Sequence, residues 1–443
     1  MPELRRELGV ASAALLVVGG IIGSGIFFTP AEVARALPSN GWILTVWILG
    51  GFMALAGALT YAELGAMLPD AGGPYVYIRH AFGSLPAFLY GWMALLSIAS
   101  GAIAAVALGF AGYLARFVNV AAVGGEMGVA TATIVLLSLT NVLGIKPGVF
   151  LQNVLTLAKI GALATLIVGG LALWTQLGPP PPAPLAPVAP ASLISGFAAA
   201  FVAVLFTIGG WQQMNMVAGE IREPERTIPR ALLVGILIVI VIYLGANGVY
   251  LHVLQRDGLA ASGAVAADVA ERLVGPTGAT LITVAAMISI LGFVNVAILT
   301  NSRLPFALAR DRVFPASIGR VHPRFGTPHL SILLMGAWAL VLLFASGGRI
   351  GQLLSGVVFA DWIFFGLGAA SVFVLRRTMA DAPRPYLAWG YPVLPGVFVV
   401  AAAVGVLSAF VSAPVMSLLG CVLLLAGVFV HRHFVRLQLA EDI

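Results

Sequence analysis

GGIIGSGIFFTP, residues 19–30, lies inside an apolar run long enough to cross a bilayer. At its centre Gly23, Ser24 and Gly25 carry almost no side chain. Glycine destabilises a helix interior by about 1 kcal/mol relative to alanine, and in lipid every backbone polar group needs a partner. A break is therefore tolerated where the freed groups line a cavity or bind a ligand. A second glycine-broken run, FTIGGW at 206–211, follows in the other half of the chain.

Composition assigns the chain to the membrane proteins. Of its 443 residues 60% are hydrophobic and 9% are charged, whereas soluble domains carry about 25% charged residues. Apolar runs of about 20 residues, each able to span the hydrocarbon layer, recur along its whole length. We therefore predict an all-α polytopic membrane protein in contact with the lipid bilayer. The net charge of +6 is interpreted as a topology signal in loops, and no nucleic-acid partner is expected.

The hydrophobic pattern predicts twelve transmembrane helices. Their predicted limits are 9–35, 40–67, 81–116, 127–145, 147–173, 191–219, 229–252, 277–310, 328–345, 350–376, 392–411 and 413–432. With the N-terminus inside, seventeen of the 23 lysines and arginines fall on the cytoplasmic side and five on the outer side. This bias follows the positive-inside rule and predicts that both termini are cytoplasmic.

The proline-rich stretch within 174–190 divides the chain into two sets of five spans, and each set begins with a glycine-broken span. An odd number of spans per set inverts the second set relative to the first. The predicted organisation is an inverted repeat with two added helices. Its parts are a cytoplasmic tail (1–8), a first repeat (9–173), an outer connector (174–190), a second repeat (191–376), a cytoplasmic loop (377–391), a helix pair (392–432) and a second cytoplasmic tail (433–443).

Paired breaks in corresponding spans predict a transporter substrate site. A half-helix that begins near Ser24 offers unpaired N–H groups and a positive dipole end to a carboxylate. Carbonyls freed at 20–22 and 206–208 suit an ammonium group. Together these groups match the two ends of an amino acid zwitterion. The alternative is that the glycines only allow helices to cross closely.

Four motifs support a family resemblance: residues 19–30, YAELG at 61–65 with AGGPY at 71–75, residues 206–211, and EIREPERTIPR at 220–230. They resemble the amino acid–polyamine–organocation superfamily, and within it the L-type amino acid transporters and their bacterial relatives. The resemblance implies the leucine-transporter-like fold, with helices 1 and 6 unwound at mid-membrane, and alternating access around a midplane site. The sequence shows no His/Cys metal-ligand spacing and no nucleophile motif in a polar context. We therefore predict no cofactor, no bound metal and no catalytic residues, and a transporter and not an enzyme.

Carried over by position, the resemblance implies that the Ser24 and Gly25 amides hold the substrate carboxylate. It also implies that the Ile21, Phe206 and Gly209 carbonyls hold the amino group, that Phe206 closes a gate, and that Trp211 walls the pocket. The predicted substrate-binding set is Ile21, Ile22, Gly23, Ser24, Gly25, Phe206, Thr207, Gly209, Gly210 and Trp211.

Lys159 lies about a dozen residues into the fifth span, too deep for easy snorkelling, and an intramembrane lysine is costly and by default functional. The resemblance implies that it occupies the place of a sodium ion in sodium-coupled relatives and ties the fifth span to the broken first span and to span eight. Transport is then sodium-independent. The alternatives are a proton carrier and a lysine that snorkels beside a wet cavity.

Three acidic residues complete the candidates. Asp361 lies mid-span where the family more often has a neutral residue, so it indicates either a proton-titrating site or an attraction for cationic substrates. Glu63 and Glu220 lie near cytoplasmic span ends, where they act as inner-gate latches with loop arginines or form surface ion pairs of little consequence.

The preferred function is sodium-independent transport of small or medium neutral L-amino acids, with exchange as the preferred mode. The alternatives are proton-coupled symport, or transport of cationic amino acids or amines through Lys159 and Asp361. A channel would show a pore motif or charged rings, and neither is evident in the sequence. A membrane enzyme would show clustered titratable groups, whereas those of this chain are scattered. Animal relatives pair with a single-span glycoprotein through an outer-loop cysteine; here the single cysteine is Cys421, so no disulfide-linked heavy-chain partner is expected. The predicted location is a bacterial inner membrane.

Overall fold

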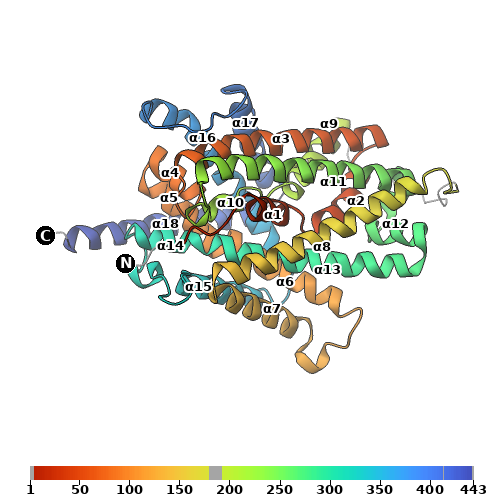
Figure 1. Cartoon of the computed structure of the whole chain (residues 1–443), viewed down its shortest axis with the longest axis horizontal. Coiled ribbons are helices and arrows are strands. Elements are labelled where there is room, and N and C mark those ends of the chain that lie inside the picture. Colours follow the sequence, from red (N-terminus) through yellow and green to blue (C-terminus); the bar gives the residue numbers. More distant parts are fainter. Residues whose placement is uncertain (1–3, 179–191, 413, 442–443) are drawn as a thin grey trace.

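The computed structural model describes residues 4–178, 192–412 and 414–441. These residues form a bundle of long helices that run along one common direction (Figure 1). The β-bridge found among them pairs Leu8 with Ile221. The proline-rich part of the predicted connector, at 179–190, lies outside the described residues.

The first predicted span is a broken helix. Its parts are α1 (Val10–Ile21) and α2 (Gly25–Ala36), and they meet at an angle of 42° across residues 22–24. The break falls on the glycine-rich stretch, where the side chains are too small to stabilise a continuous helix.

The rest of the first half consists of long helices with one irregular span. The third predicted span contains a π-helical turn, η1, between α5 and α6, a feature that occurs frequently at functional sites. The elements are α3 (Asn40–Met67), α4 (Pro74–Phe82), α5 (Ser84–Met93), η1 (Ala94–Ile98), α6 (Ala99–Leu114), α7 (Gly125–Val142) and α8 (Ile145–Ala172).

The second half begins with another interrupted segment, in which α9 ends at Thr207 and α10 begins at Gln213. Its elements are α9 (Leu193–Thr207), α10 (Gln213–Met216), α11 (Pro224–Ala261), α12 (Val265–Val274), α13 (Pro276–Asn301), α14 (Arg303–Arg310), α15 (His329–Ala345), α16 (Ile350–Thr378), α17 (Val393–Ser412) and α18 (Pro414–Glu441).

Within the described residues, eight helices or continuous helical segments are long and apolar enough to cross a membrane, and the bent pair α1–α2 raises this number to nine. The other three predicted spans coincide with α9, α15 and α16, of which α9 and α15 have 15 and 17 residues. The chain is therefore an all-helical, multi-pass membrane protein. The twelve spans and the inverted repeat remain predictions.

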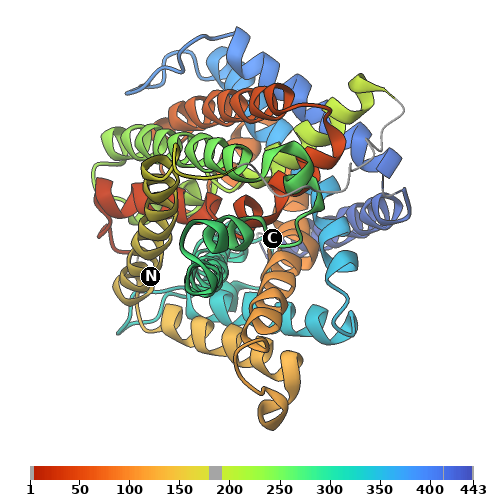
Figure 2. The same cartoon turned by 90° about the vertical axis from the view of Figure 1, so that its right-hand side faces the viewer.

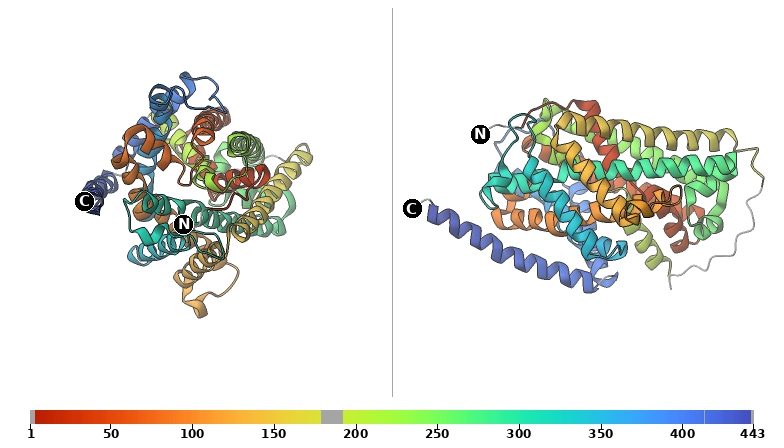
Figure 3. Two further views of the ribbon diagram at one scale, coloured as in Figure 1. Left: turned by 60° about the vertical axis from the view of Figure 1, so that its left-hand side comes forward. Right: turned by 90° about the horizontal axis from the view of Figure 1, so that it is seen from below.

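The broken helix lies in the interior of the bundle. Helix α1 packs against α8, α11 and α13, while α2 packs against α9 and α11. In the end view, the red ribbon of α1 runs from one edge of the bundle toward its middle (Figure 2). Helices α17 and α18 lie at the periphery, and α18 projects past the other helices at the end where the N-terminal segment also lies (Figure 3). The described ends of the chain, at Leu4 and Glu441, thus lie at the same end of the bundle.

Candidate functional site

The two interrupted segments meet at Gly20 and Gly210. A Cβ atom added to Gly210 would lie 2.3 Å from the Gly20 carbonyl oxygen, and one added to Gly20 would lie 2.9 Å from the Gly210 carbonyl oxygen. Gly210 also has a φ of +103°, a conformation that L-residues rarely adopt. Glycine is therefore required here for two reasons, close backbone approach and left-handed backbone geometry.

Replacing Gly210 by alanine is expected to destabilise the protein by about 2 kcal/mol or more, because the strain of the left-handed backbone adds to a clash with backbone atoms. Thermal unfolding in detergent and exchange in proteoliposomes would measure the effect. Gly161→Ala in α8 is the matched control, since an added Cβ there meets no atom within 4 Å among the described residues. Equal stability of the two variants would contradict the close approach of the breaks.

A cavity of about 370 Å³ opens beside these breaks. Its size suits a small ligand. Phe206, the predicted gate residue, lines this cavity and is 49% exposed. The lining residues from the predicted set are Ile21, Gly23, Ser24, Gly25, Phe206, Thr207, Gly209 and Gly210.

Hydrogen-bond donors reach the cavity from the start of α2. Helix α2 begins at Gly25, and the preceding Ser24 makes no side-chain capping bond to it. The first N–H groups of a helix have no intrahelical acceptor, and the helix dipole places partial positive charge there. This end of α2 can therefore bind an anionic group such as a carboxylate.

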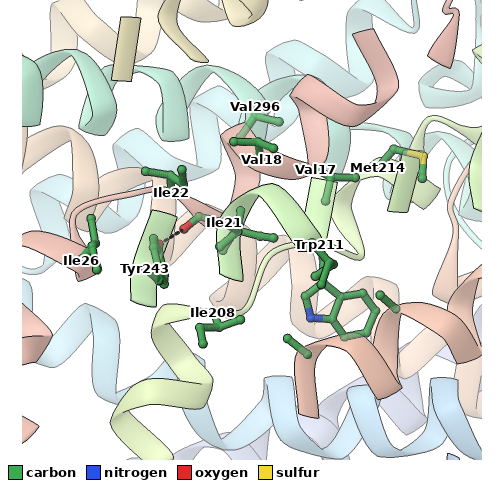
Figure 4. Close-up of a cluster of buried hydrophobic side chains, with 14 of the residues drawn as sticks. Val17, Val18, Ile21, Ile22, Ile26, Ile208, Trp211, Met214, Tyr243 and Val296 are labelled. Atoms are coloured by element: carbon green, nitrogen blue, oxygen red, sulfur yellow. Dashed lines mark hydrogen bonds between the residues drawn. The ribbon is translucent and has the colours of Figure 1, made fainter. Parts of the chain in front are cut away.

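Hydrogen-bond acceptors reach the same cavity from the C-terminal ends of α1 and α9. These helices end at Ile21 and Thr207, and their last backbone carbonyl groups are the acceptors. The Tyr243 hydroxyl of α11 lies 3.2 Å from the Ile21 carbonyl oxygen and 3.4 Å from that of Thr207. Figure 4 shows this hydroxyl directed at Ile21, with Ile208 and Trp211 nearby. Tyr243 thus connects the two breaks, and its role was missed because an isolated tyrosine in an apolar run carries no signal in the sequence.

One half of each broken segment, α2 and α9, is also joined to the other. The hydroxyls of Thr29 in α2 and Thr207 in α9 lie 2.7 Å apart. A Cβ atom on Gly25 would lie 2.6 Å from Thr207 Cγ2. Helices α2 and α9 are therefore in direct contact beside the cavity.

Two predicted binding residues are not among the described residues that line the cavity. The Ile22 carbonyl is directed away, toward Lys159 and Ser289. The Trp211 ring packs at 4.9 Å from that of Tyr61 and at 5.8 Å from that of Phe398, because the turn at Gly210 carries it toward α3 and α17. Trp211 therefore packs on the side of the break that faces α3 and α17, and it is not a wall of the cavity.

Lys159 is fully buried in α8. Its Nζ atom lies 3.1 Å from the Gly19 carbonyl oxygen, 2.5 Å from that of Ile22 and 3.4 Å from that of Ser289. The contacts implied by the resemblance, to the first span and to span eight, are therefore present. Ser289 in α13, which the sequence interpretation did not single out, adds its Oγ atom at 3.0 Å from the Ile22 and Gly23 carbonyl oxygens. The ammonium and the hydroxyl together hold the carbonyls freed by the break.

Asp361 in α16 lines the cavity, and so does Glu32 of α2. Lysine, arginine and histidine are absent from the described lining residues. The other polar lining residues outside the predicted binding set are Thr29, Tyr90, Gln212, Gln213 and Asn301. The cavity therefore combines two carboxyl groups with several neutral polar side chains.

The two predicted gate glutamates are buried. Glu63 at the end of α3 accepts two hydrogen bonds from Arg376, at 2.8 and 2.6 Å, and one from the Ala388 N–H. Glu220 accepts two bonds of 2.9 Å from Arg303. Neither is a surface ion pair, so that alternative is wrong. A latch function for them remains a prediction.

Glu220 also holds the N-terminal segment. Its backbone carbonyl accepts hydrogen bonds from the N–H groups of Glu7 and Leu8, at 2.9 and 3.0 Å, and the Leu8 carbonyl accepts one from Arg222 N–H at 2.8 Å. One buried residue thus joins the segment before α1, the segment before α11 and the start of α14.

Known proteins are similar in sequence to this chain over nearly its whole length. A family model described as amino acid permease matches residues 8–429. The serine/threonine exchanger SteT of Bacillus subtilis is 32% identical over 396 residues, which cover 88% of each chain. The human b(0,+)-type amino acid transporter 1 is 31% identical over 441 residues, 98% of this chain and 89% of the relative.

A third relative, the human large neutral amino acids transporter small subunit 2, is 33% identical over 392 residues, 86% of this chain and 72% of the relative. These relatives are named as transporters or exchangers and not as enzymes. A transport function is consistent with the two broken helices and the cavity beside them. The chain belongs to the amino acid permease family of membrane transporters, the amino acid–polyamine–organocation superfamily, and is related to its L-type branch.

Proposed function

We propose that this protein exchanges small or medium neutral L-amino acids across a membrane by alternating access, without sodium. The observation that carries the proposal is the pairing of the α2 N-terminus with the carbonyl ends of α1 and α9 around one cavity. In this proposal the Ser24 and Gly25 amides bind the carboxylate, and the Ile21, Phe206 and Gly209 carbonyls bind the ammonium group. The relative named as a serine/threonine exchanger supports both the substrate class and the exchange mode.

Sodium independence rests on Lys159. Its ammonium group, together with Ser289, binds the carbonyls of α1 that a monovalent cation would otherwise have to satisfy. A second cation at this place would be repelled by the ammonium group in a medium of low dielectric. We therefore propose that Lys159 substitutes for sodium.

Counterflow in proteoliposomes tests this proposal. Purified protein in vesicles loaded with unlabelled L-serine is expected to take up labelled L-serine, and uptake is expected to be unchanged when choline replaces sodium or when the pH gradient is collapsed. Vesicles without internal amino acid are expected to show less than roughly a tenth of this uptake, as obligatory exchange requires. Uptake into empty vesicles driven by an inward proton gradient would contradict exchange.

One observation favours a second candidate, which is proton-coupled symport or transport of cationic amino acids or amines. Asp361 and Glu32 give the cavity two carboxylates, without a basic side chain among the described lining residues. A proton or a cationic substrate would balance this charge. In this alternative Asp361 and Lys159 act as coupling residues, and preferential uptake of labelled L-lysine or proton-driven uptake into empty vesicles would identify it.

The proposed setting is the inner membrane of a bacterium, with both termini in the cytoplasm. The protein is proposed to act without a disulfide-linked heavy chain, because its single cysteine, Cys421, lies within α18 beside the apolar side chains of α5 and α16. Glu63 and Glu220 are proposed as latches of the inner gate, and Phe206 as part of the gate that closes over the substrate.

A further inference from the structure

The connection between α16 and α17, residues 379–392, is fixed to the rest of the bundle by Glu63. Glu63, near the end of α3, accepts a hydrogen bond of 2.7 Å from the Ala388 N–H and lies 3.6 Å from Arg384. Arg384 in turn donates a hydrogen bond of 2.8 Å to the Leu375 carbonyl in the last turn of α16. The connection is therefore held in a defined position against the end of α3.

The outer surface of this connection carries two large apolar side chains. Leu387 is 56% exposed and Trp389 is 64% exposed, although the residue between them, Ala388, is buried. Because the backbone of Ala388 is bonded to Glu63, these two side chains cannot turn inward without breaking that bond. Single exposed apolar residues are common on proteins, whereas a contiguous exposed patch marks a surface that contacts a partner or a membrane.

The exposed face of α17 continues this patch. Exposed apolar residues recur along α17 at every third or fourth position, which places them on one face of the helix. They are Val393, Val397, Val400, Val404, Leu407 and Val411. The opposite face, which includes Phe398 and Ala402, is buried. Because α17 is long and apolar enough to span a membrane and lies at the periphery of the bundle (Figure 3), its exposed face contacts lipid.

The chemistry of the patch identifies the layer of the membrane that it contacts. Trp389 lies four residues before Val393, where the lipid-facing stripe of α17 begins. An indole ring has an apolar body and one N–H donor, and tryptophan side chains gather at the level of the headgroups for this reason. Arg377, in the last turn of α16, is exposed as well, and a guanidinium group at the end of a span attracts lipid phosphate groups.

We propose that the α16–α17 connection is an interfacial anchor whose partner is the lipid surface. Leu387 and Trp389 insert between the headgroups and the acyl chains, on the side of the membrane where α3 ends. The anchor holds the Glu63 contact, and with it the end of α3, at a fixed depth in the bilayer. This proposal does not depend on which substrate the protein transports.

Site-directed fluorescence tests the anchor in the full-length protein. The single cysteine is removed by Cys421→Ser, and Leu387→Cys is labelled with a nitrobenzoxadiazole fluorophore. The protein is reconstituted into phosphatidylcholine–phosphatidylglycerol vesicles that carry a nitroxide either near the headgroup or near the end of an acyl chain. The shallow nitroxide is expected to quench the fluorophore at least roughly twofold more strongly than the deep one, because an interfacial segment lies only about 5–10 Å below the headgroup boundary.

Two further labelled variants give matched references at exposed positions. Val404→Cys lies eleven residues, or about 16 Å, along α17 from Val393 on the same exposed face, and it is expected to be quenched more strongly by the deep nitroxide. Leu439→Cys lies in the projecting end of α18, where the leucine is 61% exposed (Figure 3). It is expected to be quenched by aqueous iodide and by neither nitroxide. Size-exclusion profiles confirm that each variant is folded.

The quenching patterns decide the proposal. Shallow quenching at Leu387, with deep quenching at Val404 and iodide quenching at Leu439, supports the anchor. Iodide quenching at Leu387 equal to that at Leu439, without nitroxide quenching, would overturn it, because the connection would then lie in water. Protection of Leu387 from iodide and from both nitroxides would also overturn it, since another protein surface, such as a second copy of the chain, would then cover the patch.

Discussion

Replacing Lys159 by methionine is expected to slow amino acid exchange at least roughly thirtyfold, because the loss of charge-assisted hydrogen bonds to buried carbonyls costs about 2 kcal/mol or more. The side chain is fully buried, and its Nζ atom holds the Gly19 and Ile22 carbonyls of α1 and the Ser289 carbonyl of α13. Without it, the broken helix loses its link to α8. Methionine keeps the length and most of the volume, so the loss of the ammonium group is isolated from the loss of packing.

The measurement is counterflow at equal amounts of reconstituted protein, with size-exclusion profiles to confirm folding. Lys146→Met is the matched control, because Lys146 is the other lysine of the sequence and its side chain is 70% exposed beside Glu7. The control is expected to exchange at the wild-type rate. Wild-type exchange by the Lys159 variant would show that the ammonium group is not needed to hold the break.

Replacing Glu220 by alanine is expected to produce the largest loss of stability, about 3–5 kcal/mol, because it leaves the Arg303 guanidinium as an unpaired buried charge. Both side chains are almost completely inaccessible to solvent, at 0% for Glu220 and 1% for Arg303. Arg303 also bonds to the Leu299 carbonyl and to Ser302 Oγ, so it cannot easily turn toward water. The expected readout is a strong fall in thermal stability in detergent and in the yield of folded protein.

Glu63→Ala is the natural comparison, because both of its guanidinium partners are partly exposed. Arg376 is 22% exposed and stacks over the Tyr391 ring at 3.7 Å, and Arg384, 3.6 Å from Glu63, is 11% exposed. We expect this variant to lose less stability, since the unpaired guanidinium groups keep access to water. A Glu220→Leu/Arg303→Met double variant is expected to recover much of the loss of Glu220→Ala, because replacing both charges of a buried pair by apolar groups is often neutral. If Glu220→Ala were as stable as Glu63→Ala or more stable, the Glu220–Arg303 pair would not stabilise the protein more than the pair of Glu63 does.

The parts of the fold that could be predicted from sequence depend on local physics. Helices occupy all the positions predicted from hydropathy, and the broken helix falls at Gly23 and Ser24, because glycine weakens a helix regardless of its surroundings. Lys159 was also identifiable, since a lysine deep in an apolar run needs a partner in any fold. The family assignment, made from four short motifs, is confirmed by the match over residues 8–429.

The parts that could not be predicted depend on where side chains point after the helices pack. Ile22 and Trp211 lie next to lining residues in sequence, yet one carbonyl turns toward Lys159 and one ring turns toward Tyr61. The partner of Glu220 is Arg303, 83 residues away in another helix, and no local pattern identifies such a pair. Tyr243, Ser289 and Gln212 are ordinary residues in apolar surroundings, and their contacts appear only in three dimensions.

The most direct test of the central claim is a structure of the protein with a bound small neutral L-amino acid, such as L-threonine, determined in a lipid nanodisc. The account predicts that the carboxylate lies within hydrogen-bond distance of the Ser24 and Gly25 N–H groups and the ammonium group beside the Ile21 and Phe206 carbonyls. A ligand whose carboxylate is bound by Lys159, or whose ammonium group is bound by Asp361 with the α2 N-terminus left empty, would contradict it.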